Sequence, residues 1–217
     1  MKIKWLGHAC FLLTSDAGLR IVADPYTPGG FGLQYRPPAE KADIVTVSHE
    51  HADHNNVGDV KGDPQIVRGA GVHQIKGIEI KGVSTSHDEM SGSQRGSNTV
   101  FCFALDGVRV CHLGDLGHDL TAGSVAEIGE VDVLLIPVGG SFTIDAGVAS
   151  RVADRLAAKV VIPMHFKNER CPDFPVAGVA DFQKKRQRVR TVDGNEVEVK
   201  KDGLPSETET VVLKPAC

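Results

Sequence analysis

The chain has 217 residues, and its 24 lysines and arginines against 28 aspartates and glutamates give a formal net charge of −4 at pH 7 with histidine neutral. With 41% hydrophobic and 24% charged residues, the composition excludes a disordered, collagen-like or coiled-coil protein. The mild acidity argues against general nucleic-acid binding, and the apolar runs are too short to cross a bilayer. We therefore expect a single α/β domain over residues 1–217.

The opening residues and the cysteines both point to the cytoplasm. The segment Met1-Lys2-Ile3-Lys4 begins no signal peptide, and no membrane partner is expected. The five cysteines form no C-x-x-C pair, so a structural zinc site built from cysteine is not expected and a reduced compartment fits best. They are Cys10, Cys102, Cys111, Cys171 and Cys217.

In chain order, short β-branched or alternating segments predict many strands. They lie at residues 2–5, 10–14, 20–23, 44–47, 65–67, 78–83, 99–105, 108–112, 133–137, 160–163, 196–199 and 210–213. The pair Asp106-Gly107 between apolar runs predicts a tight hairpin. Helices are predicted at residues 145–158 and 177–188. Residues 25–41 are rich in proline and glycine and are predicted to form a long surface loop that makes a lip over a site. This order favours two mixed sheets packed face to face with helices outside.

A cluster of metal-ligand residue types follows the predicted strand at 44–47. It reads Ser48-His49-Glu50-His51-Ala52-Asp53-His54. Residues two apart project the same way from an extended backbone, and imidazole with carboxylate suits a borderline or first-row divalent metal. His49 and His51 can therefore hold one ion, and Asp53 with His54 a second. A solvated polar turn is the alternative interpretation.

Three further candidates stand at strand ends. His87, Asp115 and His165 each follow an apolar strand. Taken alone, His87 or His165 is more often a hydrogen-bonded histidine than a ligand. Their shared position favours ligation once the first cluster is granted.

Weaker signals suggest substrate contacts. His8 follows the first strand and can donate a proton or bind substrate, and a hydrogen-bonded turn histidine is the alternative. Arg95 and Asn98 can grip an anionic substrate, with a solvated loop as the alternative. Gly139 and Gly140 allow close backbone approach to a ligand, as does an ordinary tight turn.

The remaining histidines and one basic run have plainer interpretations. His73, His112 and His118 are expected at the surface, in a strand and in a loop, and a place for His118 in the pocket wall is the alternative. The run from Lys184 to Arg190 is usually a solvated helix face, and more rarely a patch for phosphate or RNA.

The spacing His-x-His-x-Asp-His, then an isolated histidine, Gly-Asp and a late histidine resembles the metallo-β-lactamase superfamily, from about Met1 to His165. Three further segments are similar to a branch of small metal-dependent hydrolases related to the L-ascorbate-6-phosphate lactonases. They are Leu6-Gly7-His8-Ala9-Cys10-Phe11, Gln94-Arg95-Gly96-Ser97-Asn98-Thr99 and Val138-Gly139-Gly140-Ser141-Phe142-Thr143. The implied fold is a four-layer αββα sandwich of two mixed sheets.

The resemblance implies a ligand set for two divalent metal ions. One ion is bound by His49, His51 and His87, and the other by Asp53, His54 and His165, with Asp115 bridging. Asp24 matches an early aspartate of the pattern and is expected to fix a ligating imidazole or the histidine-rich loop. Zinc is the preferred metal, and manganese, iron or nickel are alternatives because the ligands do not discriminate.

These residues predict a dinuclear hydrolase in which a metal-bridged hydroxide cleaves an ester, lactone or phosphodiester. Asp53 and Asp115 would orient that hydroxide and accept its proton, and His8 is a further catalytic candidate. The expected substrate is a small anionic molecule, not nucleic acid, and a homo-oligomer is left open.

Several relatives of different function fit less well. An antibiotic-cleaving β-lactamase is disfavoured by the missing secretion signal and by Asp115, and a glyoxalase by the short, strand-like segment after His165. A di-iron oxygen reductase would carry a carboxylate in place of His51 and a flavin domain. An RNA-processing phosphodiesterase remains open, although no inserted arm for RNA is visible. A non-catalytic metal-dependent binding or sensor protein with the same fold is the remaining alternative.

Overall fold

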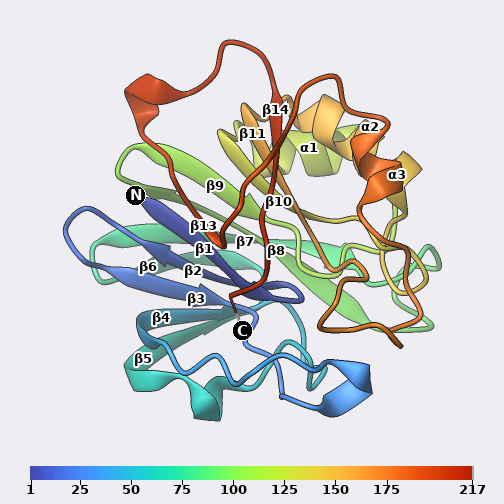
Figure 1. Ribbon diagram of the computed structural model, residues 1–217. Coiled ribbons are helices and arrows are strands. Elements are labelled where there is room, and N and C mark those ends of the chain that lie inside the picture. The colour runs from blue at the N-terminus through green and yellow to red at the C-terminus, as the bar shows by residue number, and fades with distance from the viewer. Residues whose placement is uncertain (217) are drawn as a thin grey trace.

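The computed structural model describes residues 1–216, which form two β-sheets packed face to face (Figure 1). The six-stranded sheet has the order β13-β1-β2-β3-β4-β5. Its strands are β1 (Lys2–Gly7), β2 (Cys10–Thr14), β3 (Arg20–Ala23), β4 (Lys41–Val47), β5 (Lys61–Arg68) and β13 (Glu196–Glu198). Strands β13, β1, β2 and β3 pair antiparallel, and β3, β4 and β5 pair parallel, so the sheet is mixed.

The eight-stranded sheet has the order β12-β14-β11-β10-β9-β8-β7-β6. Its strands are β6 (Gly71–Ile75), β7 (Ile78–Ser86), β8 (Ser97–Leu105), β9 (Val108–His112), β10 (Val133–Pro137), β11 (Val160–Met164), β12 (Val189–Thr191) and β14 (Glu209–Val212). It is parallel from β12 to β9 and antiparallel from β9 to β6. The predicted pair of mixed sheets is confirmed.

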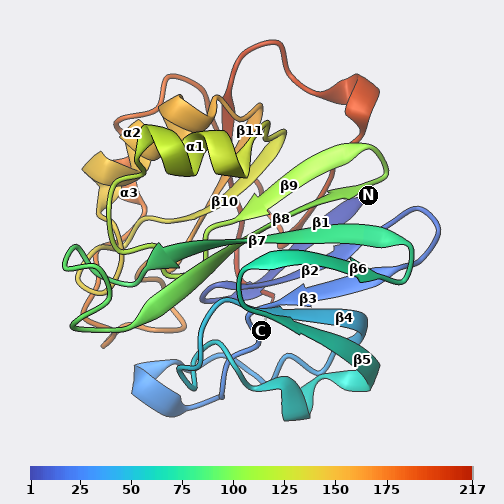
Figure 2. The ribbon, with the colours of Figure 1, turned by 180° about the vertical axis from the view of Figure 1, so that it is seen from behind.

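Helices cover the outer face of the eight-stranded sheet. They are α1 (Ala122–Ile128), α2 (Ala146–Leu156) and α3 (Ala180–Gln183), and both views show them together on the side of β10 and β11 (Figures 1 and 2). Strand β10 is buried at every position because helices cover one face and the other sheet covers the opposite face. The main core between the sheets contains Trp5, Phe11 and Phe101.

The outer face of the six-stranded sheet is covered differently. Within residues 1–216 no α-helix lies there, and a second core forms between the sheet and two irregular segments. Tyr26, Leu33 and Tyr35 from the loop at 25–41, and Phe174 from the segment after β11, are buried against the strands. The loop predicted to be a surface lip is therefore anchored by its own apolar side chains, and it contains a 3-10 turn at Gly30–Gly32.

The predicted tight hairpin is present between β8 and β9. Asp106 and Gly107 have φ values of 52° and 75°, which is the left-handed pair that a two-residue hairpin turn requires. Strands β6 and β12 and helix α1 were not predicted. Thr121 caps the start of α1, because its hydroxyl accepts a hydrogen bond from the amide of Ser124 at 3.1 Å. The helix has only seven residues, so the sequence pattern that follows this cap is too short to stand out.

The predicted helix at 177–188 is wrong in extent. Helix α3 ends at Gln183, and the basic run does not form a helix face. Arg186 instead bonds to Asp154 at 2.7 Å, Arg188 to Glu207 at 2.9 Å and Arg190 to Glu209 at 3.2 Å. Arg188 precedes β12 and Arg190 lies in it. The run therefore links the segment around β12 to Asp154 on α2 and to Glu207 and Glu209 at β14.

The histidines expected outside the site lie outside it. His73 is on β6, where its ring contacts the Gly69 carbonyl at 3.3 Å. His112 is fully buried at the end of β9 with Nε2 2.8 Å from the Ala9 carbonyl, and His118 accepts a hydrogen bond from the amide of Ser86. Among residues 1–216, no helix has the length and apolar character needed to span a membrane.

Candidate metal centre

The candidate ligands meet at one edge of the sandwich because each follows the carboxyl end of a strand. His8 follows β1, Asp24 follows β3, the histidine-rich segment follows β4, His87 follows β7, Asp115 comes after β9, and His165 follows β11. The segments are far apart in sequence but converge where the two sheets meet. The sequence prediction that these residues gather in one place agrees with this geometry.

Three of these residues adopt an unusual backbone conformation. His8, Asp24 and His165 have φ values of 52°, 45° and 52°, in the left-handed region that L-residues seldom occupy. Such conformations cost roughly 1–2 kcal/mol each and persist where the surrounding structure imposes them. Here the chain turns sharply at a strand end, which aims each side chain into the centre.

The first group consists of His49, His51 and His87, whose ligand atoms all lie within 4.8 Å of one another. His49 Nε2 lies 3.1 Å from His51 Nδ1. His49 and His87 are buried and His51 is exposed, so this half of the centre opens to solvent. Burial, reinforced by the neighbouring His54, lowers the pKa of His49 to about 3, so the ring is neutral and carries a lone pair at neutral pH.

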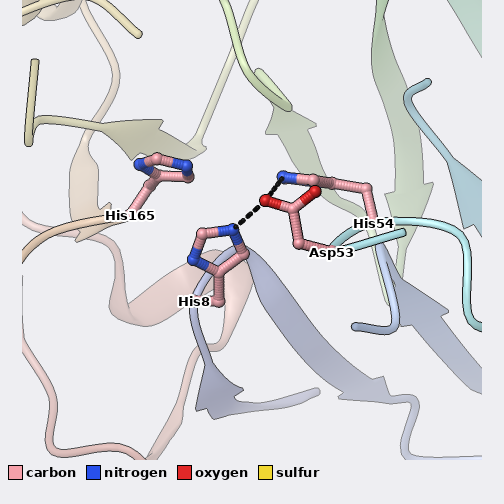
Figure 3. Close-up of side chains that lie close together, drawn as sticks. All are labelled: His8, Asp53, His54 and His165. Atoms are coloured by element: carbon pink, nitrogen blue, oxygen red, sulfur yellow. Dashed lines mark hydrogen bonds and ion pairs between the residues drawn. The ribbon is translucent and has the colours of Figure 1, made fainter. Parts of the chain in front are cut away.

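The second group consists of Asp53, His54 and His165, with His8 beside them. Figure 3 shows the Asp53 carboxylate between the imidazoles of His8 and His54, with the His165 ring facing them. Asp53 Oδ2 lies 3.2 Å from His8 Nε2 and 3.8 Å from His54 Nε2. Burial would raise the pKa of Asp53, but the hydrogen bond from His8 and the charge of His54 hold it below its ordinary value.

Asp115 lies between the two groups. Its Oδ2 atom is 3.2 Å from His54 Nε2, 3.3 Å from His87 Nε2 and 3.3 Å from His165 Nε2. The carboxylate is therefore in reach of an imidazole from the first group and two from the second. Burial would raise the pKa of Asp115, but His165 and His54 hold it well below its ordinary value, so the group is an anion.

Asp24 supports the centre from behind. It is fully buried, and its carboxylate accepts hydrogen bonds from the Ser48 amide at 2.8 Å and the Ser48 hydroxyl at 2.5 Å. Its Oδ2 atom also lies 2.9 Å from His54 Nδ1. This contact assigns the Nδ1 proton of His54 and leaves Nε2 for the centre, the arrangement expected of a carboxylate that orients a ligating imidazole.

His8 is buried and contacts the second group through both its backbone and its ring. Its carbonyl accepts hydrogen bonds from the His165 amide at 3.1 Å and from Trp5 Nε1 at 3.0 Å. Its ring centroid lies 4.2 Å from that of His165. Burial and the neighbouring His165 lower the pKa of His8 to about 4, so this imidazole is neutral at pH 7.

Polar atoms left without partners show that the residues fit a cation. His54 Nε2 and Asp115 Oδ1 are buried and have no hydrogen-bond partner in the described chain. Buried polar groups are normally satisfied, and an unsatisfied one costs about 1–3 kcal/mol. Burial would lower the pKa of His54, but Asp115, Asp24 and Asp53 hold it well above its ordinary value. The raised pKa means that His54 Nε2 would carry a proton when no metal is bound. A bound divalent cation would take the place of this proton and would satisfy both His54 Nε2 and Asp115 Oδ1.

Arg95 is positioned by an aspartate that the sequence analysis did not single out. Asp88 accepts hydrogen bonds from four backbone amides of the loop that follows His87, at 2.7–2.9 Å, and one of them is the Arg95 amide. The signal in the sequence is an aspartate before a run rich in glycine and serine, which is typical of a side chain that organises a turn. The Arg95 side chain reaches a cavity beside the centre.

Asn98, Gly139 and Gly140 were predicted to contact substrate, but none of them lines the cavity beside the centre. Asn98 is buried with its amide fully engaged, since Nδ2 donates to Thr85 Oγ1 and the Leu113 carbonyl, and Oδ1 accepts from the Asp115 amide at 2.9 Å. A Cβ at Gly139 would lie 2.2 Å from the His165 carbonyl, so this glycine permits close packing on His165. Gly140 lines a neighbouring cavity.

A cavity of about 460 Å³ opens beside the candidate ligands. Its lining includes His51, Asp53, His87, Asp115 and His165. Phe31 and Phe174, from the two irregular segments over the six-stranded sheet, line it as well. The predicted loop at 25–41 therefore does contribute to the lip of this cavity.

Residues 2–165 match the family model described as the beta-lactamase superfamily domain. The chain belongs to the metallo-β-lactamase superfamily. A structure from Thermotoga maritima, a candidate zinc-dependent hydrolase of this superfamily, is 43% identical with a TM-score of 0.82, covering 98% of this chain and 97% of that one.

Curated relatives agree with this membership. A metal-dependent hydrolase of Archaeoglobus fulgidus is 30% identical over 99% of this chain and 96% of that protein. One from Methanoculleus marisnigri is 34% identical over 76% of this chain and 81% of that protein. The predicted superfamily and its fold of two mixed sheets with flanking helices are confirmed, although irregular segments stand in place of one helical layer of the αββα sandwich. The enzyme class given to these relatives is the predicted one. The closer resemblance to the L-ascorbate-6-phosphate lactonases stays a prediction.

Proposed function

We propose that this protein is a dinuclear metal-dependent hydrolase that cleaves an ester, lactone or phosphodiester bond in a small anionic molecule. The observation that carries the proposal is the position of Asp115, whose Oδ2 lies within 3.3 Å of imidazole nitrogens from both ligand groups. The coarser class supports it, since the relative from Archaeoglobus is named a metal-dependent hydrolase and the one from Thermotoga a candidate zinc-dependent hydrolase. We expect the enzyme in the cytoplasm, with zinc as the preferred metal.

Seven residues would hold the two ions. His49, His51 and His87 would bind the first, Asp53, His54 and His165 the second, and Asp115 would contact both. When bound, such ions lower the pKa of a coordinated water toward neutrality and polarise the oxygen of the scissile bond. The donor set suits this role because burial keeps His49 neutral and Asp24 directs His54 through its Nδ1 atom.

The chain itself would manage the proton. Asp53 lines the cavity, and its Oδ2 lies 3.2 Å from Nε2 of the buried His8. The carboxylate of Asp53 would accept the proton of the attacking nucleophile, and the hydrogen bond from His8 Nε2 would hold that carboxylate in position. Phe174 packs edge-on against the His8 ring, with centroids 5.5 Å apart, and limits its exposure to water.

Arg95 would bind the anionic part of the substrate. Its guanidinium is half-buried at the wall of the same cavity, where it stacks on Phe142. Guanidinium presents a planar set of donors that matches carboxylate and phosphate oxygens. The proposal does not require Asn98 to touch the substrate, because its amide is already engaged.

The direct test is turnover by purified, metal-loaded protein on a panel of phenyl esters, lactones and phosphodiesters. We expect hydrolysis of at least one class, and a loss of about 10³-fold or more when His51 and Asp115 are both replaced by Ala. His73→Ala is the matched control, because this histidine lies on β6 away from the cluster, and it should retain full activity.

Three outcomes would contradict the proposal. Turnover that survives the double replacement would show that the cluster is not the reactive centre. Tight metal binding without turnover of any substrate class would favour a metal-dependent binding or sensor protein instead, and selective cleavage of RNA would favour a processing phosphodiesterase.

A further inference from the structure

The cavity beside the candidate metal centre has an aromatic wall that the proposed chemistry does not itself require. Phe31, Phe142 and Phe174 all line it. Phe142 and Phe174 stack with ring centroids 5.6 Å apart and planes inclined by 26°. Phe174 also contacts the ring of His165, with centroids 5.4 Å apart. The aromatic wall therefore reaches directly to a candidate ligand of the second ion.

Phe31 is held at the rim in a costly arrangement. Its side chain is 65% exposed, and its backbone has a φ of 54°, although Gly29, Gly30 and Gly32 surround it. An L-residue in this conformation costs roughly 1–2 kcal/mol, which a fourth glycine would avoid. The turn is anchored by hydrogen bonds from Gly29 to Leu33 and from Gln34 to Arg170. An apolar group lying in the cavity would cover the exposed ring.

Arg95 supplies a positive charge on the same cavity. Its guanidinium carbon lies 5.6 Å from the centroid of Phe142. Within residues 1–216 this guanidinium forms no ion pair, whereas the nearby Arg68 pairs with Glu50 at 3.0 Å. The Arg95 amide donates a 2.7 Å hydrogen bond to the Asp88 carboxylate. This bond fixes the backbone from which the Arg95 side chain extends.

We propose that this cavity binds an aromatic anion, with the ring of the ligand on Phe31, Phe142 and Phe174 and its carboxylate, phosphate or sulfonate on Arg95. This inference rests on the proposed function only in treating the bound molecule as a substrate whose bond is hydrolysed. What it adds is the chemical class of that molecule. The stacked Arg95–Phe142 pair offers a cation beside an apolar surface, which is the complement of an aryl group carrying one negative charge. The extension of the wall to His165 would bring such a molecule next to the cluster.

The test uses a matched pair of ligands and measures binding rather than turnover. Naphthalene-2-sulfonate is the anionic probe, chosen because sulfonate oxygens are weak metal ligands, and methyl 2-naphthyl sulfone is its neutral counterpart. Binding of each is measured by calorimetry on the metal-loaded protein. We expect the sulfonate to bind about tenfold more tightly than the sulfone, as a charge-assisted contact to guanidinium provides.

Variants separate the two halves of the site. Arg95→Met keeps the stem and should abolish the preference for sulfonate while changing sulfone affinity by less than about twofold. Arg68→Met is the matched control, since that arginine is already paired, and it should leave the preference intact. Phe31→Gly removes the ring and suits the left-handed backbone, so it should weaken both probes about equally without lowering the melting temperature.

The inference fails if wild-type protein binds the two probes equally, or if Arg95→Met leaves the preference unchanged. It also fails if Phe31→Gly leaves both affinities unchanged. Because no turnover is measured, a protein that shows the expected preference but hydrolyses nothing would contradict the proposed function and not the ligand class.

Discussion

The carboxylate of Asp24 lies 2.9 Å from Nδ1 of His54, and both side chains are completely buried. The two residues come from the ends of different parallel strands, β3 and the segment after β4. This single contact fixes the ring plane of His54 and directs its other nitrogen toward Asp115, 3.2 Å away. The centre is thus ordered by a residue that never faces the cavity.

Replacing Asp24 by Asn should weaken metal binding without removing any proposed ligand. The amide keeps one acceptor for Ser48 but loses the charge that complements His54, and such supporting contacts typically contribute 10–100-fold in metal affinity. Chelator competition on Asp24→Asn measures this loss. Asp59→Asn, at an exposed turn, is the control and should bind metal as wild type does. Unchanged affinity in Asp24→Asn would contradict the role assigned to this contact.

Asn98→Ala distinguishes a positioning role from substrate contact. The replacement removes three buried hydrogen bonds, including the one that holds the Asp115 amide, and should destabilise the fold by about 3 kcal/mol. We expect kcat to fall more than KM rises, because Asp115 is displaced. A variant of wild-type stability with a raised KM alone would instead support the contact that the sequence predicted.

Gly139→Ala should disturb His165 from behind. A methyl group there would lie 2.2 Å from the His165 carbonyl and 3.0 Å from Val176 Cβ, and neither neighbour can move freely inside the packed edge. Such overpacking costs about 2 kcal/mol, seen as a lower melting temperature, and metal affinity should fall with it. Gly123→Ala in helix α1 is the matched control, because its nearest atom is 3.6 Å away and alanine favours a helix.

Stability in acid should depend on Asp132, far from the metal centre. This buried carboxylate accepts bonds from the Arg109 amide and guanidinium and from Lys201 Nζ at 2.6 Å. Burial would raise its pKa, but Arg109 and Lys201 hold the pKa below the ordinary value. Its contribution is therefore complete above about pH 4 and is lost as the pH falls through the folded-state pKa.

Urea unfolding of Asp132→Asn from pH 7 to pH 3 tests this. At pH 7 the variant should be less stable by about 2 kcal/mol, and the difference should shrink as the pH drops below 4. Asp181→Asn removes an exposed carboxylate whose ion pair within residues 1–216 is with Lys184, and it should change little at any pH. A difference that stays constant with pH would contradict the assignment.

The sequence predicted the strands and the ligand cluster because both are local patterns. Short β-branched or alternating segments marked most strands, and four ligand-type residues fall within the six positions from His49 to His54. Strand β6 was missed because it lies at a sheet edge with mostly exposed side chains, and α1 because it is only seven residues long. Residues 184–188 have helical composition, but ion pairs to distant acidic residues hold them in another conformation.

Apart from Asp24, the supporting residues of the centre were harder to predict. An asparagine side chain can bind a substrate or hydrogen-bond to the protein's own backbone, and the sequence does not tell these two roles apart. The contacts of Asn98 with Thr85 and Leu113 in the folded chain identify the second role. Asp88 precedes a run rich in glycine and serine, but that pattern does not say which amides it binds, because they are set by the folded shape of the loop up to Arg95. Phe31 and Phe174 lie far apart in sequence, and only the packing of two irregular segments brings them to one cavity.

The central claim is that two cations bind on either side of Asp115. The most direct measurement is anomalous X-ray scattering at the zinc edge from crystals of the zinc-loaded protein. The account predicts two peaks per chain, one contacting His49, His51 and His87 and the other contacting Asp53, His54 and His165, with the Asp115 carboxylate between them. A single peak, or peaks that do not contact Asp115, would contradict it.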